Sequence, residues 1–166
     1  MSPAAAPRWR DALSDERIAH LIKNAFRGTS SALQARLRKH SVQYGHWTLL
    51  RVLWQTDGLT QRELSEQAGV REPSTFAALQ RMEQLGYVTR RKRLGNNKQI
   101  RVHLTAKGAA LRAVSVSAAE DVNRIALSGI AAEDVAATRR TLIAMIENLE
   151  GDAVRYGAAK PRASAS

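Results

Sequence analysis

Apolar residues in the first part of the chain recur at steps of three, four and seven positions over residues 14–39. This spacing places them on one face of an amphipathic helix of about seven turns. The apolar residues on this face are Ile18, Leu21, Ile22, Ala25, Phe26, Leu33 and Leu37. A second helix is predicted over residues 43–56, where Asp57 and Gly58 supply a C-terminal stop.

Two shorter helices are predicted next, joined by a tight turn. Thr60 and Glu63 have the spacing of a capping box, in which each side chain bonds to the backbone N–H of the other residue. The helix that follows covers residues 61–68. The second covers residues 73–85 and begins with Pro73, whose missing N–H costs nothing at a first helical position. A glycine follows each helix, as is common where a helix ends.

Beyond residue 86 the hydrophobic period changes to two, which predicts strands. Two sets of residues alternate here, with Val88, Ile100, Val102 and Leu104 set against Arg90, Gln99, Arg101 and His103. Gly95, Asn96 and Asn97 lie between them as turn residues, so the segment is predicted to be a two-stranded hairpin. Helical spacing returns over residues 105–128 and 132–153, and the second of these carries a short coiled-coil-like seam.

This order of elements predicts a mainly α fold with a small β-hairpin wing, in the α+β class. A winged helix–turn–helix lobe is framed by long helices that we expect to form a dimerisation layer. The expected parts are a flexible N-terminus (1–13), an N-terminal dimerisation helix (14–40), the winged helix–turn–helix DNA-binding domain (41–105), C-terminal dimerisation helices (106–155) and a disordered tail (156–166).

Charge points to a polyanion as the partner. The chain of 166 residues has a formal net charge of +11, and a globular protein this basic usually meets nucleic acid or an anionic membrane. Residues 86–107 contain seven Lys or Arg and no Asp or Glu. A charge run is often only a solvated face, but a basic hairpin beside an exposed helix favours contacts to DNA phosphates.

Other classes of function lack their residues. There is no cysteine, which excludes disulfides, thiol nucleophiles and cysteine redox sensing, and the four His have no metal-ligand spacing. Neither a Gly-rich phosphate loop nor a nucleophile arrangement is present, so we expect no enzyme, no cofactor and no metal. No apolar run could span a membrane and no secretory signal is seen, so the expected location is the cytoplasm.

The helix over residues 73–85 is the expected reader of the major groove, and the hairpin is the expected source of phosphate contacts. The predicted DNA-binding residues are Thr60, Gln61, Arg71, Pro73, Ser74, Ala77, Gln80, Arg81, Arg90, Arg91, Lys92, Arg93, Asn97, Lys98 and Arg101. Lys98, at the hairpin tip, is expected to enter a narrow minor groove.

A second cluster has two interpretations. Trp47 and Trp54 are seven residues apart on one helix face, where they are either plain core or the wall of a ligand site. The ligand interpretation fits a small aromatic or acyl acid, since an Arg can form two hydrogen bonds to the carboxylate while Trp packs on the ring of the ligand. The candidate ligand-binding residues are His20, Tyr44, Trp47, Arg51 and Trp54.

Three segments carry a resemblance to a known family. Residues 59–64 (LTQREL), 79–90 (LQRMEQLGYVTR) and 102–108 (VHLTAKG) resemble successive blocks of the MarR family of bacterial transcriptional regulators. The resemblance implies a homodimer with intertwined terminal helices and two winged lobes on adjacent major grooves of a pseudo-palindrome. It also implies a small-molecule pocket between the dimerisation helices and the DNA lobe.

The predicted function is therefore a sequence-specific, homodimeric regulator of transcription. It is expected to act as a repressor that a small organic acid releases from double-stranded DNA. The alternative is an architectural DNA-binding protein of low specificity without an effector, which the basic hairpin would serve equally well.

Two positions depart from the family pattern. The wing tip usually carries Asp-x-Arg, and Asn96 and Lys98 stand there in this chain. The charge survives, but a Lys is a point charge rather than a rigid fork, so readout of A·T-rich flanks is expected to be looser. Ala77 replaces an Arg or another polar residue, and with Phe76 at this face it favours contacts to thymine methyl groups.

Overall fold

The computed structural model describes residues 17–93 and 96–155, and of residues 93, 96–99 and 154 it describes the backbone alone. The predictions for residues 1–13 and 156–166, the start of the first helix at residue 14, and Gly95 at the hairpin turn lie outside the described residues. The chain divides into two compact units, one up to Asn123 and one from Arg124 onward, and each is taken by itself.

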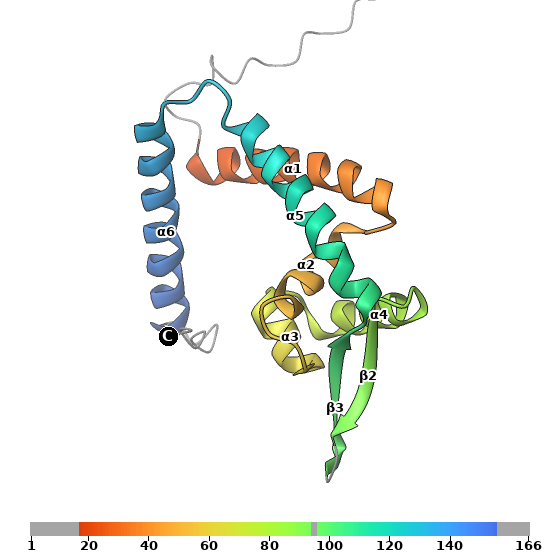
Figure 1. Ribbon diagram of the computed structural model, residues 1–166. Helices are drawn as coiled ribbons and strands as arrows, with labels where there is room; N and C mark the ends of the chain where they lie inside the picture. Colours follow the sequence, from red (N-terminus) through yellow and green to blue (C-terminus); the bar gives the residue numbers. More distant parts are fainter. Residues whose placement is uncertain (1–16, 94–95, 156–166) are drawn as a thin grey trace, which may run out of the picture. The chain divides into compact units, whose positions relative to one another are not determined.

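Helices α1 (Ile18–Leu37) and α2 (Tyr44–Leu53) open the first unit (Figure 1). A short 3₁₀ helix, η2 (Arg38–His40), lies between them in the chain. Ser41 ends η2 with a left-handed φ of 60°, which turns the chain toward α2. Helix α2 is shorter than the predicted 43–56 because the residues after Leu53 form turns before the next strand.

Helices α3 (Gln61–Ala68) and α4 (Glu72–Gln84) form the helix–turn–helix. The predicted capping box is present: the Thr60 N–H donates to Glu63 Oε2 at 2.7 Å, and the Glu63 N–H donates to Thr60 Oγ1 at 3.2 Å. Helix α4 begins one residue earlier than predicted, so Pro73 is at its second position rather than its first. The missing N–H still costs nothing, because the first four N–H groups of a helix have no partner within it.

The sheet has three strands rather than the predicted two. Strand β1 (Leu59–Thr60) pairs with β3 (Asn96–Leu104), which pairs with β2 (Val88–Arg93), all antiparallel. Two residues are too few to show a period of two, and therefore the sequence pattern missed β1. The predicted turn was also too wide, since β3 already begins at Asn96.

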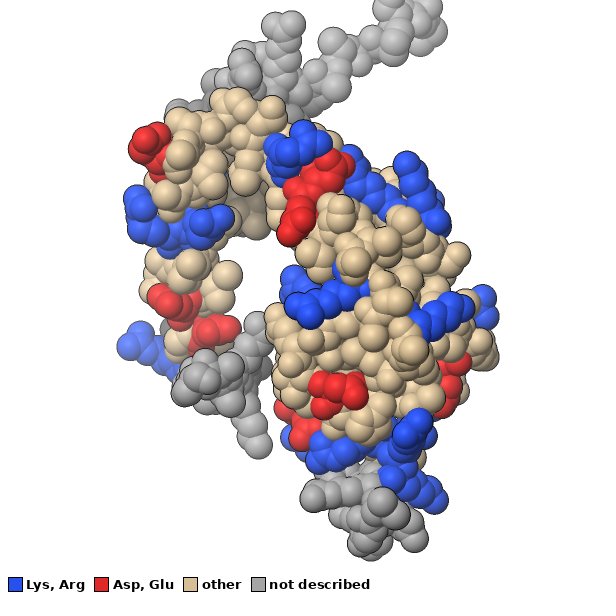
Figure 2. Space-filling model, in the orientation of Figure 1, with Lys and Arg blue, Asp and Glu red and all other residues tan. Residues whose placement is uncertain are grey.

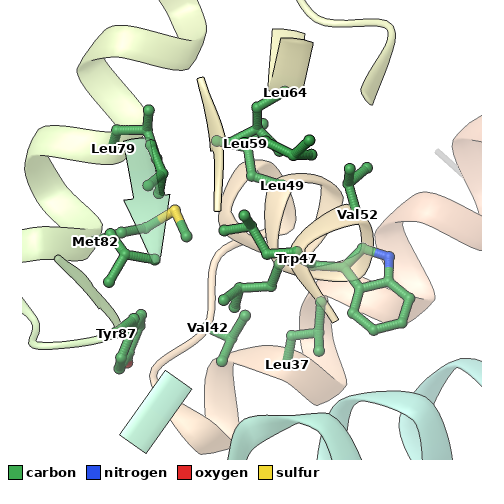
Figure 3. Packing of buried hydrophobic residues seen from close by; sticks show 14 of the residues in the cluster. Leu37, Val42, Trp47, Leu49, Val52, Leu59, Leu64, Leu79, Met82 and Tyr87 are labelled. Atoms are coloured by element: carbon green, nitrogen blue, oxygen red, sulfur yellow. The ribbon is translucent and has the colours of Figure 1, made fainter. Parts of the chain in front are cut away.

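The core of the first unit lies where α2, α3 and α4 meet the sheet (Figure 3). Leu50 and Leu53 from α2 pack with Leu64 of α3 and Met82 of α4, and all four are buried. The remaining members of the core are Leu33, Leu37, Val42, Trp47, Leu49, Val52, Leu59, Leu79, Tyr87, Val88, Val102 and Val122. This core fixes α4 and the base of the hairpin in one lobe.

Helix α5 (Ala106–Ala126) follows the hairpin and buries Gly108, Ser115 and Val122, which are seven residues apart. In the second unit, α6 (Ala132–Arg155) keeps large apolar side chains exposed, with Leu142 37% and Leu149 65% accessible. None of the helices within residues 17–93 and 96–155 has both the length and the apolarity needed to cross a membrane.

Candidate nucleic-acid interface

Helix α4 presents the two faces that the sequence predicted. Thr75, Leu79 and Met82 are fully buried against the core. On the other side Ser74, Ala77, Gln80, Arg81 and Gln84 are exposed, and Pro73 is exposed in the first turn. The Arg81 guanidinium donates to Gln84 Oε1 at 3.0 Å, which leaves the rest of its donors on the surface. The exposed face is therefore a polar and cationic helix surface of the kind that reads a major groove.

The hairpin brings like charges together. Arg91 of β2 is directly opposite Arg101 of β3 in the antiparallel register. Like charges at opposed positions repel, and the Glu63 carboxylate, 3.9 Å from Arg101, offsets part of this repulsion. Arg91 and Lys92 are exposed, and Figure 2 shows Lys and Arg gathered where the hairpin leaves the lobe. This surface is complementary to the phosphates of a polyanion.

Arg90 is not on the face that the sequence pattern predicted. Residues two apart in a strand share a face, so Arg90 is on the same side as Val88, opposite Val102 of β3, and toward α4. Its guanidinium is half-buried and donates to Glu83 Oε2 at 2.6 and 2.9 Å. These hydrogen bonds hold the pKa of the Glu83 carboxyl below its ordinary value. Arg90 thus joins the wing to α4, instead of standing free for a phosphate.

Two more predicted DNA-binding residues have their polar groups engaged within the protein. Arg101 donates to the carbonyl oxygen of Gly58 at 2.6 Å and is 3.9 Å from the Glu63 carboxylate. The Thr60 hydroxyl is occupied by the capping box. Gln61 is half-buried beside it, whereas Arg71 is exposed at the N-terminus of α4. The side chains of the remaining candidates, Arg93, Asn97 and Lys98, lie outside the described residues.

His46 of α2 is buried, with 3% of its surface exposed. Its Nδ1 has no hydrogen-bond partner among the described residues, and its ring meets the ring of Tyr87 edge-on at 6.4 Å. Burial, together with the nearby Arg81 charge, lowers the pKa of His46 below its ordinary value of 6.5. Folding therefore favours the neutral form of the His46 imidazole over the charged form.

Acid should consequently weaken the lobe. A histidine whose pKa is depressed by folding stabilises the native state above its ordinary pKa, and this stability is lost as pH falls through the depressed value. We expect the free energy of unfolding to fall as pH drops below 6.5, and His46→Gln to reduce this fall. Urea unfolding at a series of pH values measures it, with the exposed His40→Gln as control. An equal acid slope in His46→Gln and the parent would refute the expectation.

Two of the five candidate ligand residues, Trp47 and Trp54, are in contact in the structure. Trp47 is 7% exposed within the core, and its ring meets that of Trp54 at 5.6 Å. The Trp54 indole N–H donates to the Gly108 carbonyl at 3.0 Å, which ties α2 to α5. His20 and Arg51 are exposed on α1 and α2.

A surface hollow lies elsewhere on the first unit. It has a volume of about 520 Å³ and is located where α1 turns into α2. Of the five candidate ligand residues, Tyr44 lines it, together with Gln34 and Arg38. The Tyr44 N–H donates to Gln34 Oε1 at 2.7 Å, which fixes one wall of the hollow. In the single chain Trp47 is part of the core and Trp54 packs against it, and neither side chain lines this hollow.

Sequence reasoning missed two carboxylates that shape the interface. Glu83 holds Arg90, and Asp57 accepts from the Leu104 N–H at 2.8 Å while its other oxygen is 3.0 Å from His103 Nδ1. Both pairings join different elements of the fold, with a separation of seven residues for Glu83 and Arg90 and of 46 or 47 residues for Asp57 and its partners. One feature of the sequence could have indicated the position of Arg90. It is two residues after the buried Val88, and residues two apart in a strand are on the same face.

Comparison with known proteins agrees with this architecture. Residues 42–100 match the model of the MarR family. The organic hydroperoxide resistance transcriptional regulator of Bacillus subtilis is 24% identical over 135 residues, which cover 81% of this chain and 90% of that protein.

Over residues 42–100, the chain is similar to the MarR family.

Solved structures share its fold. A MarR family transcriptional regulator from Listeria monocytogenes, in complex with a 26mer DNA, superposes with a TM-score of 0.74 at 19% identity over 89% of this chain and 99% of that one. A Mycobacterium tuberculosis MarR family protein, in complex with salicylic acid, gives 0.65 at 22% identity over 80% and 98%. The predicted winged-helix fold is confirmed, and the relatives that match this chain are transcriptional regulators.

Proposed function

We propose that this protein is a homodimeric, sequence-specific MarR-family repressor whose hold on DNA is released by a small organic acid. The observation that carries the first part is the exposed face of α4 beside a hairpin segment that has seven Lys or Arg and no Asp or Glu. Gln80 and Arg81 offer hydrogen bonds to base edges, and Arg91 and Lys92 offer positive charge to phosphates. A dimer that covers a promoter with two such lobes excludes the polymerase from the same DNA.

The test of sequence specificity is a comparison of two DNA molecules at one salt concentration. A duplex selected by the protein from a random pool should bind at least a thousandfold more tightly than scrambled DNA, the low end of the range for specific regulators. Equal affinity for both would favour the architectural alternative, which the net charge of +11 also suits.

Two arginines should separate base reading from phosphate binding. Arg81→Ala is expected to cost about 1–3 kcal/mol on the selected duplex and to relax discrimination at particular base pairs. Arg91→Ala should weaken all sequences alike and reduce the dependence of affinity on salt. Titrations of selected and scrambled duplexes at several salt concentrations measure both effects. If Arg81→Ala weakens the two duplexes by the same factor, Arg81 does not read bases.

Apolar residues outside the core support the dimer. Ile143 and Ile146 of α6 are about half exposed, beside Leu142 and Leu149, and Ile18 and Phe26 of α1 are likewise exposed. A helix gains most of its stability from packing its apolar face. An exposed apolar stripe of this kind therefore indicates that another surface covers it. A second copy of the chain supplies an identical stripe and gives the paired lobes that a pseudo-palindromic site requires.

The effector is proposed to be an acid. The Mycobacterium relative was solved with salicylic acid, and this chain offers Arg38 and Tyr44 at its surface hollow and Arg51 on α2 as partners for a carboxylate. The sequence contains no cysteine, so the response cannot run through oxidation of a thiol. Such a ligand would lower DNA affinity only by the ratio of its affinities for the two dimer states.

Arg51 is the first anchor to test. We expect the Arg51→Ala variant to bind the selected duplex as tightly as the parent and to stay bound when salicylate is added. If Arg51 had only a structural role, the substitution would also lower the free energy of unfolding. DNA anisotropy and intrinsic Trp fluorescence, both titrated with salicylate, measure the two. Arg38→Ala is the matched variant for the hollow. Release of Arg51→Ala at the same salicylate concentration as the parent rules out Arg51 as the anchor.

A further inference from the structure

Helix α4 carries one large apolar side chain among the polar residues of its exposed surface. Phe76 is 44% exposed, in the second turn of the helix, between Ser74 and Gln80. It shares a stripe with Gln80 and Glu83, which follow it by four and seven residues and therefore lie on the same side of the helix. The buried face of α4 is formed by Thr75, Leu79 and Met82 instead, so Phe76 is not needed for the core.

The ring of Phe76 is held in place from the wing. The Arg90 guanidinium carbon is 5.9 Å from the Phe76 ring centroid, in a cation–π arrangement. The same guanidinium is bound by Glu83 through two short hydrogen bonds, and the Arg90 N–H also donates to Glu83 Oε1 at 3.3 Å. Glu83, Arg90 and Phe76 therefore form a braced row along the side of α4 that faces the hairpin.

A rigid, exposed ring at this place suits one feature of a base pair. In the major groove only thymine presents a methyl group, and apolar side chains such as Phe recognise it by contact. A Phe ring has no donor or acceptor, so it cannot read the other base edges by hydrogen bonds.

We propose that Phe76 is a specificity-determining residue that contacts the 5-methyl group of a thymine in each half-site, with Arg90 and Glu83 as its positioning residues. The proposal rests on the proposed function, because it requires a specific DNA site. Phe76 would thus contact bases through an apolar side chain in a protein that has Ala77 where the family often has Arg or another polar residue. It also accounts for Arg90 being withdrawn from the phosphate-binding surface.

The test changes the DNA by single methyl groups and leaves the protein intact. The duplex selected by the protein is synthesised with deoxyuridine in place of each thymine in turn, which removes the methyl and keeps every hydrogen-bonding group. We expect one position in each half-site to lose about fourfold in affinity, the worth of one buried methyl group. The other thymines serve as internal controls.

Variants then assign the effect. Phe76→Ala should bind the thymine and deoxyuridine duplexes equally, and Phe76→Leu, which keeps an apolar side chain, should retain part of the difference. Glu83→Gln should reduce the ratio of the two affinities because Arg90 is no longer held against the ring. A ratio is unaffected by any uniform loss of binding, which a merely structural role of Glu83 would cause.

The outcomes are distinguishable. A site that is selected but insensitive to deoxyuridine at every thymine overturns the assignment of Phe76 and leaves the proposed function standing. Sensitivity that persists unchanged in Phe76→Ala overturns it too, and assigns the methyl contact to another residue such as Ala77. If no sequence is selected over scrambled DNA, the proposed function falls and this inference falls with it.

Discussion

Replacement of Gly108 by Ala is expected to lower the free energy of unfolding by about 3 kcal/mol or more, at the upper end of the cost of overpacking. A Cβ at Gly108 would overlap the carbonyl oxygen of Tyr87 and lie 2.9 Å from the carbonyl carbon. That carbonyl accepts the Thr105 N–H at 3.0 Å, and the Tyr87 side chain is buried and donates to the Ser41 carbonyl. The Cβ would therefore collide with a backbone carbonyl that hydrogen bonds and side-chain packing fix in place, and moving this carbonyl would cost further free energy.

Urea unfolding followed by Trp fluorescence measures the loss. Gly45→Ala is the matched control, because Gly45 is also helical and a Cβ there meets nothing within 4 Å. That variant should be as stable as the parent or slightly more so, since Ala favours a helix over Gly by about 1 kcal/mol. Equal midpoints for Gly108→Ala and Gly45→Ala would show that α5 does not pack this closely on Tyr87.

The double variant Leu142→Glu and Leu149→Glu is expected to be monomeric and to lose about a hundredfold or more in affinity for its selected duplex. The two leucines are one heptad apart on α6, and charges there would have to be buried in the proposed dimer. A monomer binds one half-site and loses the gain from linking two binding events.

Light scattering gives the oligomeric state and anisotropy the DNA affinity. Asn148→Glu adds one negative charge to the same helix away from the stripe, and this variant should remain a dimer that binds DNA. Unmutated protein that is monomeric at micromolar concentration contradicts the proposed dimer. A dimer that persists in the double variant would place the interface on other helices.

Local signals in the sequence predicted the elements of the lobe well. The hydroxyl and carboxylate of Thr60 and Glu63 are three residues apart, and the box that they form in the structure needs no distant partner. Gly69 and Gly86 end their helices with φ values of 65° and 73°. This left-handed conformation favours glycine, so the glycine in the sequence was enough to predict it. The faces of α4 followed from helical periodicity for the same reason.

The role of individual side chains in the site was less accessible from the sequence. A count of charges treats Arg90, Arg91 and Arg101 as equal, yet Arg90 meets Glu83 and Arg101 meets the Gly58 carbonyl, while Arg91 is exposed. Trp47 and Trp54 fitted both core and ligand pocket, and in the single chain Trp47 is core while the Trp54 indole is bonded to Gly108.

The amino-acid sequence by itself determined the order of helices and hairpin, the capped and glycine-ended helix–turn–helix, and the basic wing, since each depends on residues within a few positions of one another. Only the tertiary structure decided which cations remain available to DNA, that a two-residue strand joins the hairpin, and that Phe76 is braced at the reading surface. These depend on partners in different elements of the fold, some of them far apart in the chain: Leu59 of β1 pairs with Val102 of β3, and Arg90 of β2 reaches back to Glu83 and Phe76 of α4. Side-chain pairing between different elements follows from how the core packs, and the local hydrophobic period of the sequence does not predict it.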